Sequence, residues 1–362
     1  MKILHVSDIT FVGGGINTVL PEQLKYENHL DDIESELLLT SQKSVNIPGD
    51  IDFKYYFLRN DFDELLRKIN PDFVQFHSFY KTSFLKIYKT IIKNEIPYFI
   101  KPHGGLSKVA QKKGFFKKKV ANLLLFNDFL KKSTGIIFLN QLEKKNSFFQ
   151  HPNTFFIPNG VDLIENKKNN NYEEIKVLYL GRIDFKLKGI DILLKKIFEC
   201  KEYLQENNVK VNFYGFGANK DIEKLLKSIK KMNLEKIVTF HGKVTGKEKI
   251  KVLRSHNLFI LTSKTEGMPM GVIEALSNGL PCVLSKGTNM SDIVVKSQAG
   301  WEFNENKGNG LVEALKDYQQ NAYPYNENAR LLGREFTWDK LIKTYKEEYN
   351  KINDMVHVNE ES

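Results

Sequence analysis

The sequence predicts an α/β protein made of two domains, each a doubly wound parallel sheet. Strand-like and helix-like segments alternate along nearly the whole chain, which is the pattern of βαβ units. A polar stretch at residues 159–174 interrupts the alternation, and a new strand pattern then begins at Ile175. The 362 residues are too many for one typical domain and suit two. The predicted domains are therefore residues 1–160 and 161–336.

In the first half, short apolar runs rich in β-branched and aromatic residues indicate strands, with apolar residues at helical spacing between them. The expected strands are Lys2–Ser7, Ser35–Thr40, Phe53–Phe57, Phe73–His77, Tyr98–Lys101, Gly135–Leu139 and Thr154–Ile157. The expected helices are one that starts near Ile16, then Asp61–Ile69, Ser83–Lys93 and Lys118–Lys131.

The second half repeats the alternation and ends in a helical pattern. The expected strands include Ile175–Leu180, Lys210–Tyr214, Ile237–Phe240, Leu258–Leu261 and Pro281–Leu284. Residues 337–354 are expected to form a closing helix that packs back toward the first domain, and residues 355–362 a disordered tail. Two such sheets would face a cleft at their strand carboxyl ends, where doubly wound folds bind ligands.

Composition excludes several classes of protein. With 41% hydrophobic residues the chain can build real cores and is neither disordered nor collagen-like. No apolar run approaches the ~18 residues of a membrane span, and Met1 leads into a strand pattern without a signal peptide. Cys200 and Cys282 lie in apolar periodic segments and are expected to be buried, reduced thiols. These features predict a cytoplasmic protein.

The formal net charge of +10 indicates either an anionic partner or a solvated basic surface. Six lysines and no acidic residue fall within the segment Lys108–Lys119, around Phe115 and Phe116. Such a segment is typical of anionic membrane surfaces, so a peripheral position on the cytoplasmic face of the inner membrane is expected. A solvated lysine face is the alternative. Nucleic-acid binding ranks third, because the cluster lacks arginine.

The most informative segment is Glu266-Gly-Met-Pro-Met-Gly-Val-Ile-Glu274, which follows a buried strand pattern and runs into a helical one. Glu266 is expected near the carboxyl end of a strand, and Glu274 about one turn into the next helix. The amides of Met270 and Gly271 would lie between them at the helix N-terminus. Such a site suits a diphosphate that carries a sugar at one end and a ribose at the other.

A second segment, Gly181-Arg-Ile-Asp-Phe-Lys-Leu-Lys-Gly189, follows the first strand of the second half. Arg182 and Lys188 flank one strand-to-helix loop, where a guanidinium and an ammonium can neutralise a leaving diphosphate. Lys186 offers a competing cation. Each segment alone is compatible with an ordinary structural loop, and the two together favour a functional site.

The two segments resemble the E-x7-E signature and the Gly-Arg and Lys-Gly motif of retaining glycosyltransferases of family 4. These enzymes have the GT-B fold, in which two Rossmann-like domains face a central cleft. The resemblance covers almost the whole chain and is strongest over residues 175–300. It implies transfer of a sugar from a nucleotide-diphospho-sugar, by preference a UDP-sugar, to an acceptor hydroxyl. The acceptor would be a lipid-linked or growing glycan of a bacterial surface polysaccharide.

The resemblance also implies roles for single residues. Glu274 would accept hydrogen bonds from the ribose hydroxyls and Glu266 from the sugar hydroxyls, while the cations hold the diphosphate. The implied catalytic residues are His103, Arg182, Lys188 and Glu266. The residues implied for donor binding are Gly14, Gly15, Gly215, Gly217, Val244, Met270, Gly271 and Glu274.

In the first half, His103 follows a strand and precedes two glycines, so it could reach the donor sugar. His77, at the end of another strand, is a second candidate and would face the acceptor. Gly13-Gly14-Gly15 lets the backbone approach the donor closely. The dinucleotide pattern Gly-x-Gly-x-x-Gly fails at Thr18, which argues against an NAD oxidoreductase.

No metal and no cofactor are expected. Two Asp-x-Asp triplets, Asp50-Ile-Asp52 and Asp61-Phe-Asp63, lie in a turn and at a helix start, where acids are common for other reasons. Pro269 departs from the family's usual pattern and removes one amide donor, so phosphate capture would rest on Met270 and Gly271. Two alternatives share the fold: a nucleotide-sugar epimerase and a non-catalytic nucleotide-sugar-binding protein.

Overall fold

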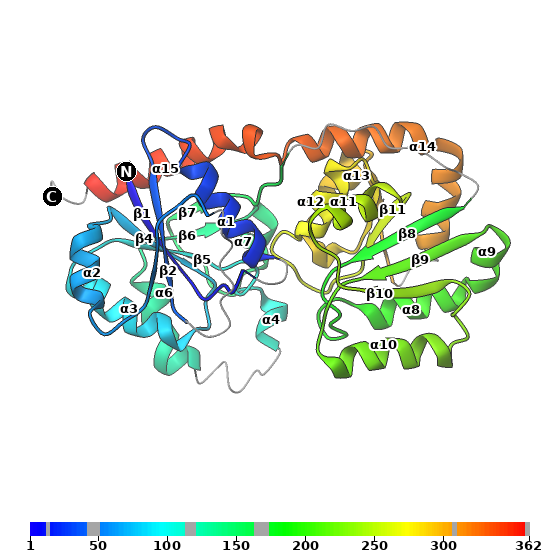
Figure 1. The fold of residues 1–362 in the computed structure, drawn as a ribbon, viewed down its shortest axis with the longest axis horizontal. Coiled ribbons are helices and arrows are strands. Elements are labelled where there is room, and N and C mark those ends of the chain that lie inside the picture. The colour runs from blue at the N-terminus through cyan, green and yellow to red at the C-terminus, as the bar shows by residue number, and fades with distance from the viewer. Residues whose placement is uncertain (12–14, 42–50, 113–120, 163–173, 306–309, 359–362) are drawn as a thin grey trace. The chain divides into compact units, whose positions relative to one another are not determined.

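The computed structural model describes residues 1–11, 15–41, 51–112, 121–162, 174–305 and 310–358 (Figure 1). The chain divides into two compact units. The first unit contains Met1–Gly160 and Trp338–Ser362, and the second contains Val161–Thr337. Within the described ranges, no helix is long and apolar enough to cross a membrane.

The first unit is built on a parallel sheet with the strand order β3-β2-β1-β4-β5-β6-β7. Its strands are β1 (Lys2–Ser7), β2 (Glu34–Leu39), β3 (Tyr55–Phe57), β4 (Phe73–His77), β5 (Tyr98–Lys101), β6 (Gly135–Phe138) and β7 (Thr154–Phe156). Its helices are α1 (Ile16–Glu27), α2 (Phe62–Ile69), α3 (Thr82–Lys93), α4 (Lys108–Lys112), α6 (Asn127–Lys131), α7 (Gln141–Asn146) and α15 (Trp338–Val358).

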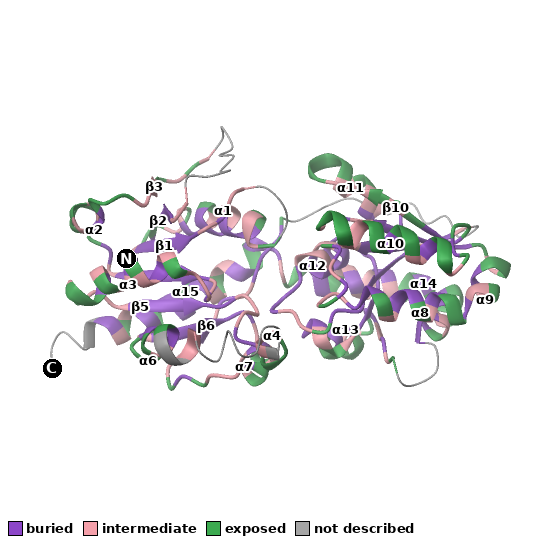
Figure 2. Ribbon diagram, turned by 90° about the horizontal axis from the view of Figure 1, so that it is seen from below, coloured by how far each residue is buried: buried purple, intermediate pink, exposed green. Residues whose placement is uncertain are grey.

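The inner strands of the first sheet, β1, β4, β5 and β6, are almost wholly buried, as parallel strands are when helices cover both faces, whereas the edge strand β3 is partly exposed (Figure 2). Aromatic rings fill the face under α2, α3 and α6, where Phe76, Tyr98 and Phe129 contact one another. The other face packs against α1 through an aliphatic cluster that includes Leu20. This second face also buries the polar side chain of His5.

The second unit is built on a parallel sheet with the strand order β10-β9-β8-β11-β12-β13. Its strands are β8 (Ile175–Leu180), β9 (Val209–Tyr214), β10 (Val238–Gly242), β11 (Leu258–Leu261), β12 (Cys282–Leu284) and β13 (Gly300–Glu302). Its helices are α8 (Ile190–Glu199), α9 (Lys201–Glu206), α10 (Asn219–Lys231), α11 (Gly246–Arg254), α12 (Met270–Ser277), the 3₁₀ turn η2 (Lys286–Thr288), α13 (Ser291–Lys296) and α14 (Gly310–Arg334).

The predicted α/β class is confirmed, and the expected strands match the observed ones to within two residues at each end. Strand β13 and helix α14 were not among the expected elements. The expected helix Lys118–Lys131 contains a π-helical turn, η1 (Asn122–Phe126), ahead of α6. The polar stretch expected at the domain boundary lies mostly outside the described residues. Cys200 and Cys282 are buried free thiols, as expected.

The last helix, α15, packs on the first unit. Trp338 stacks on Tyr26 with ring centroids 5.1 Å apart, and the Tyr345 hydroxyl donates to the carbonyl of Pro158 at 2.7 Å. The helix continues to Val358, so the expectation of a tail beginning at residue 355 is wrong. The physical reason is that Val356 is buried and extends the apolar face of the helix by another turn.

Trp338 anchors the start of α15, and its replacement tests how firmly this helix is held. Trp338→Ala should lower the free energy of unfolding by about 3–5 kcal/mol, because the ring is buried against Tyr26 and Gly160. Lys343→Ala, on the exposed side of the same helix, should change it by less than about 0.5 kcal/mol. Urea titrations followed by circular dichroism measure both, and equal losses would contradict the anchoring role.

Candidate functional site

The expected donor-site residues of the second unit gather at one edge of its sheet. Strands β10, β9, β8 and β11 are neighbours and run parallel, so the loops that follow them emerge on the same side. Val244 follows β10, Gly215 and Gly217 follow β9, Arg182 and Lys188 follow β8, and Glu266 follows β11.

At this edge Lys188 and Glu266 form an ion pair between the Lys188 Nζ and the Glu266 Oε1. Both side chains are mostly buried, with exposed fractions of 15% and 16%. The Ser263 hydroxyl donates to the same carboxylate oxygen at 2.6 Å, and the Asn289 side-chain amide donates to the Glu266 carbonyl at 2.5 Å. Contacts with Lys188, Ser263 and Asn289 therefore hold the loop that carries Glu266.

The loops after β8 and β11 lie against each other because Gly189 has no side chain. Its φ is 62°, and a Cβ there would lie 2.1 Å from the Thr262 carbonyl oxygen. The Thr262 hydroxyl donates to the Gly189 carbonyl at 2.9 Å, and the Lys264 amide donates to the Leu187 carbonyl at 2.8 Å. These backbone contacts bring Lys188 next to Glu266.

Arg182 lies in the same loop as Lys188 but has different neighbours. Its guanidinium is about half exposed, at 53%, and lies 3.8 Å from the Asp184 carboxylate. The buried Tyr179 hydroxyl donates to the Arg182 carbonyl at 2.9 Å, which holds the backbone of this loop. The side chain of Lys186 points to solvent in this loop, so it is exposed where Lys188 is covered.

The start of α12 lies against the end of β8. A Cβ on Gly271 would lie 2.8 Å from the Leu180 carbonyl oxygen, so only glycine allows this approach. The amides of Val272 and Ile273 both donate to the Pro269 carbonyl, at 3.0 and 3.5 Å. The preceding amides of Met270 and Gly271 are the first of the helix and have no carbonyl of their own helix to bond. They form its positive end.

Glu274 is the fifth residue of α12, about one turn in, as predicted. Its carboxylate pairs with Lys249 of α11, with 2.8 Å between the Lys249 Nζ and the Glu274 Oε1. The exposed fractions are 25% for Lys249 and 15% for Glu274. Sequence reasoning missed Lys249, because a lysine in a charged helix resembles its exposed neighbours.

Gly215 and Gly217 allow the loop after β9 to pack on the loop after β8. A Cβ on Gly215 would lie 1.8 Å from the Gly181 carbonyl oxygen, and one on Gly217 would lie 2.5 Å from that of Ile183. The Gly215 amide donates to the Gly242 carbonyl at 2.7 Å. The Gly215 amide therefore already has a partner within the protein. Gly215 serves to let the two loops pack closely and does not offer a free amide donor.

An aromatic pair lies at the ends of β9 and β10, beside Val244. The rings of Tyr214 and His241 stack with centroids 4.5 Å apart and an angle of 11°. The His241 Nε2 lies 2.8 Å from the Asn212 Oδ1, and burial lowers the pKa of His241. The His241 ring is therefore neutral and is held by Asn212 at the start of the loop that follows β10.

The expected first-unit residues are found at the carboxyl ends of β1 and β5. Gly14 lies outside the described residues. Gly15 has a φ of 67° and caps α1, with its carbonyl accepting from the Thr18 amide at 3.0 Å. His103 follows β5 with a φ of 48°, and its Nε2 lies 3.0 Å from the Nδ1 of His77. His77 is fully buried, so the expectation that it faces an acceptor is wrong.

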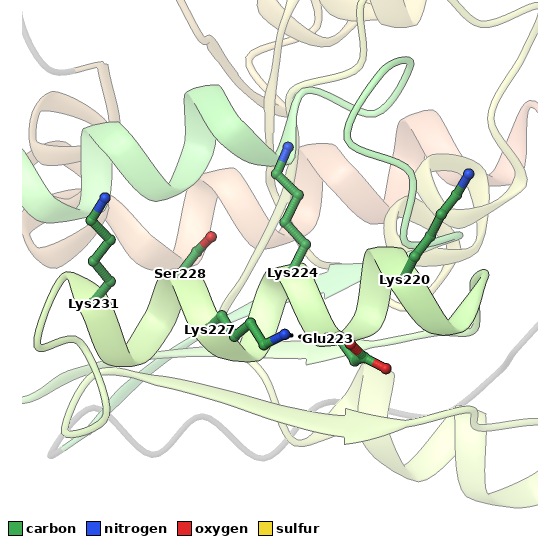
Figure 3. Close-up of a pocket in the computed structure, with 6 residues that line it drawn as sticks. All are labelled: Lys220, Glu223, Lys224, Lys227, Ser228 and Lys231. Atoms are coloured by element: carbon green, nitrogen blue, oxygen red, sulfur yellow. Dashed lines mark ion pairs between the residues drawn. The ribbon is translucent and has the colours of Figure 1, made fainter.

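A surface hollow of about 250 Å³ lies along α10, and none of its lining residues is an expected site residue (Figure 3). Its lining residues are Lys220, Glu223, Lys224, Lys227, Ser228 and Lys231. The lysines give this helix a basic face, which the search for motifs did not single out.

In the second acidic triplet, the Asp63 carboxylate has ordinary partners. Asp63 pairs with Arg67 at 2.9 Å and accepts from the Asn94 amide at 2.8 Å. Asp50 lies outside the described residues. In the described part of the chain, no three His, Cys, Asp or Glu side chains are grouped so as to hold a metal ion.

Known proteins resemble the part of the chain that carries these loops. Residues 161–333 match the family model described as glycosyl transferases group 1. An uncharacterized glycosyltransferase of Haemophilus influenzae is 26% identical over 58% of this chain and 60% of its own length. Poly(ribitol-phosphate) alpha-N-acetylglucosaminyltransferase of Staphylococcus aureus is 26% identical over 64% of this chain and 45% of its own length.

Among solved structures, the HepE protein of Anabaena in complex with UDP and glucose superposes with a TM-score of 0.74. The superposition covers 97% of this chain and 100% of that one, at 17% identity. The two parallel-sheet units have the GT-B fold. Over residues 161–333, the second unit of this chain is similar to the group 1 glycosyl transferases.

Proposed function

We propose that the chain is a retaining glycosyltransferase that moves a sugar from a UDP-sugar to a hydroxyl group without a metal. The acceptor is a lipid-linked or growing glycan of a bacterial cell-surface polysaccharide. The observation that carries the proposal is the Lys188–Glu266 pair beside the open end of α12. The Anabaena protein was solved with UDP and glucose, and the S. aureus relative is named for transfer to poly(ribitol-phosphate), which supports both halves of the proposal.

In this proposal the diphosphate binds to cations and amides of the second unit. The Lys188 ammonium, the Arg182 guanidinium and the amides of Met270 and Gly271 offer it charge and hydrogen bonds. Glu274, held by Lys249, accepts from the ribose hydroxyls. The loops with Gly14, Gly15, Gly215, Gly217 and Val244 line the donor.

Donor binding would divide the Lys188–Glu266 pair. A phosphate attracts the ammonium strongly, and the hydroxyls of the sugar can satisfy the Glu266 carboxylate in its place. As the bond between sugar and phosphate breaks, charge grows on the departing diphosphate beside cations that are already in position. Each well-aimed donor is worth roughly 3–4 kcal/mol in the transition state. The acceptor hydroxyl attacks on the face that the diphosphate leaves and gives its proton to the departing phosphate oxygen, while His103 contacts the sugar.

One experiment separates this proposal from its alternatives. The full chain is incubated with labelled UDP-sugars, with and without a lipid-linked acceptor, and the products are analysed for the new linkage and its anomeric form. Transfer with the donor's anomeric configuration is expected. Conversion of the donor without any acceptor would instead identify an epimerase. Binding of UDP without turnover across donors and acceptors would identify a non-catalytic binding protein.

Lys188→Met tests the cation at the diphosphate. The variant should lose about 100-fold or more in kcat, because the charge on the leaving group is no longer balanced. The matched control is Lys196→Met, which removes another largely buried lysine whose Nζ lies 2.9 Å from Glu199 in the same unit. The control should keep near-normal turnover. Equal activity in both variants, with both folded, would refute the role of Lys188.

Glu274→Gln and Lys249→Met test the ribose contact and its support. Each should weaken UDP binding measured by calorimetry, Glu274→Gln by about tenfold and Lys249→Met by less. If Lys249 acts only by holding Glu274, the double variant should bind UDP as weakly as Glu274→Gln alone. Lys251→Met, an exposed lysine of the same helix, is the control. Additive losses would show that Lys249 contacts the nucleotide independently.

We also propose that the lysine cluster between Lys108 and Lys119 attracts anionic membranes. Residues 113–120 lie outside the described part of the chain, and α4 carries the exposed Lys108. Changing Lys113, Lys117, Lys118 and Lys119 to glutamine should reduce pelleting with phosphatidylglycerol vesicles severalfold. The control removes the same charge from the α10 hollow, by changing Lys220, Lys224, Lys227 and Lys231. Greater loss in the control would move the contact surface to α10.

A further inference from the structure

Behind His103, a row of histidines runs into the interior of the first unit and ends on a carboxylate. The His103 Nε2 lies 3.0 Å from the His77 Nδ1, and the His77 Nε2 lies 2.8 Å from the His5 Nδ1. The His5 Nε2 lies 2.9 Å from the Glu27 Oε2. Both nitrogens of His77 and the Nδ1 of His5 therefore face a neighbouring ring, and the His5 Nε2 lies at ion-pair distance from the carboxylate. Among the described residues, none forms a hydrogen bond with the Nδ1 of His103.

The sheet itself aligns the row. His5 belongs to β1, His77 ends β4 and His103 follows β5, and these three strands are neighbours in the sheet. The register pairs His5 with Gln75 and His77 with Lys101, so these side chains share the face covered by α1. His5 and His77 are fully buried, and only 1% of the Glu27 surface is exposed.

Such a row is costly in a protein core unless every polar atom is paired. Glu27 is accordingly surrounded by donors: the Gln23 amide and the Ser35 hydroxyl each lie at 2.7 Å, and the Tyr349 hydroxyl of α15 also donates to it. Aliphatic side chains would fill this face at no such cost. The polar groups therefore point to a use beyond packing.

The charge on Glu27 decides where the protons lie. Burial alone would raise the pKa of Glu27, but His5 and the hydrogen bonds from Tyr349 and Gln23 outweigh it and hold the pKa below its usual value. The carboxylate is thus ionised and accepts only, so the His5 Nε2 must carry a proton. Burial lowers the pKa of both His77 and His103 well below its usual value, so these rings are neutral.

A neutral imidazole has one N–H, so the position of the proton on one ring determines its position on the next. In the arrangement in which all three rings are neutral, His5 keeps its proton on Nε2 and accepts at Nδ1 from the His77 Nε2. His77 then accepts at its own Nδ1 from the His103 Nε2. The Nδ1 of His103 is left as an acceptor. The Gln75 side-chain amide lies 3.0 Å from the His77 Nε2, and its oxygen must face that N–H in this arrangement.

We propose that Glu27, His5 and His77 are positioning residues that hold His103 with its Nδ1 as a hydrogen-bond acceptor for a hydroxyl of the bound sugar. The inference rests on the proposed function for the identity of the ligand. When the row takes up one proton at the His103 Nδ1, the two hydrogen bonds between the histidines reverse. The His5 Nε2 still faces Glu27, the charge lies on His5, and the His103 Nδ1 becomes a donor. The protonated row no longer accepts from the hydroxyl, so turnover falls at low pH.

Other titratable groups lie close to the row and must be separated from it. Lys101 of β5 bonds Gln23 at 2.9 Å, and burial lowers its pKa to about 8. Glu143 of α7 accepts from the Leu139 amide at 2.7 Å, and burial raises its pKa to about 6. Tyr345 and Tyr349 of α15 stay neutral, because burial raises the pKa of both well above its usual value.

The first test does not depend on turnover. Nitrogen NMR of the full chain with ¹⁵N-labelled histidine should show His5, His77 and His103 protonated on Nε2 at pH 8, with the Nδ1 of His103 bare. The His77→Gln variant assigns the signals, and in this variant His103 should no longer prefer the proton on Nε2. A proton on the Nδ1 of His103 at this pH would overturn the proposal. If NMR shows these tautomers but no acceptor receives a sugar, the proposed function is wrong, while the proton arrangement proposed for the histidines still holds.

The second test uses the sign of a pH shift. Glu27→Gln removes the charge that favours the protonated row, so the pKa of the row falls. The acidic limb of the kcat profile should therefore move to lower pH, by about one unit or more. Glu36→Gln is the control, since it removes a buried carboxylate from the opposite face of the same sheet. A limb that stays in place, or moves equally in both variants, would mean that Glu27 only supports the fold.

Discussion

The site of the second unit depends on the close approach of the loops that follow β8 and β11. Lys188 and Glu266 are mostly buried, and removing two charges from water is repaid only when they meet in good geometry. The geometry comes from the backbone, because Gly189 lies against the Thr262 carbonyl where no other residue fits. The charged pair is thus placed by contacts that carry no charge, and Ser263 and Asn289 complete its support.

The two units prepare their chemical groups in different ways. The second unit stacks glycine-containing loops at the strand ends, so that amides and cations surround one place at the edge of the sheet. The first unit instead buries a polar row under the strand ends, from Glu27 to His103, and leaves one ring nitrogen at its outer end. In both units a hydrogen bond from a neighbouring residue contacts the outer group: Ser263 bonds Glu266, and His77 lies at hydrogen-bond distance from His103.

Much of the fold and part of the site could be predicted from sequence. Buried parallel strands are continuous apolar runs, so most strand positions were recognisable. Glu266 and Glu274 were recognisable because the strand, turn and helix that carry them are contiguous. Lys249 was not, since its partner is 25 residues away and neither residue differs locally from a solvated charge. The end of α15 was misjudged, because Val356 becomes part of the core only through packing.

The sequence by itself determined the alternating architecture, the strand ends and the residue types that follow them, because these depend on short-range periodicity and on the conformational needs of glycine and proline. Only the tertiary structure decided which of those residues meet. It paired Lys188 with Glu266 and aligned His5, His77 and His103 across three strands that are far apart in the chain. The physical reason is that a contact between distant segments arises from sheet order and register, and neither leaves a local pattern.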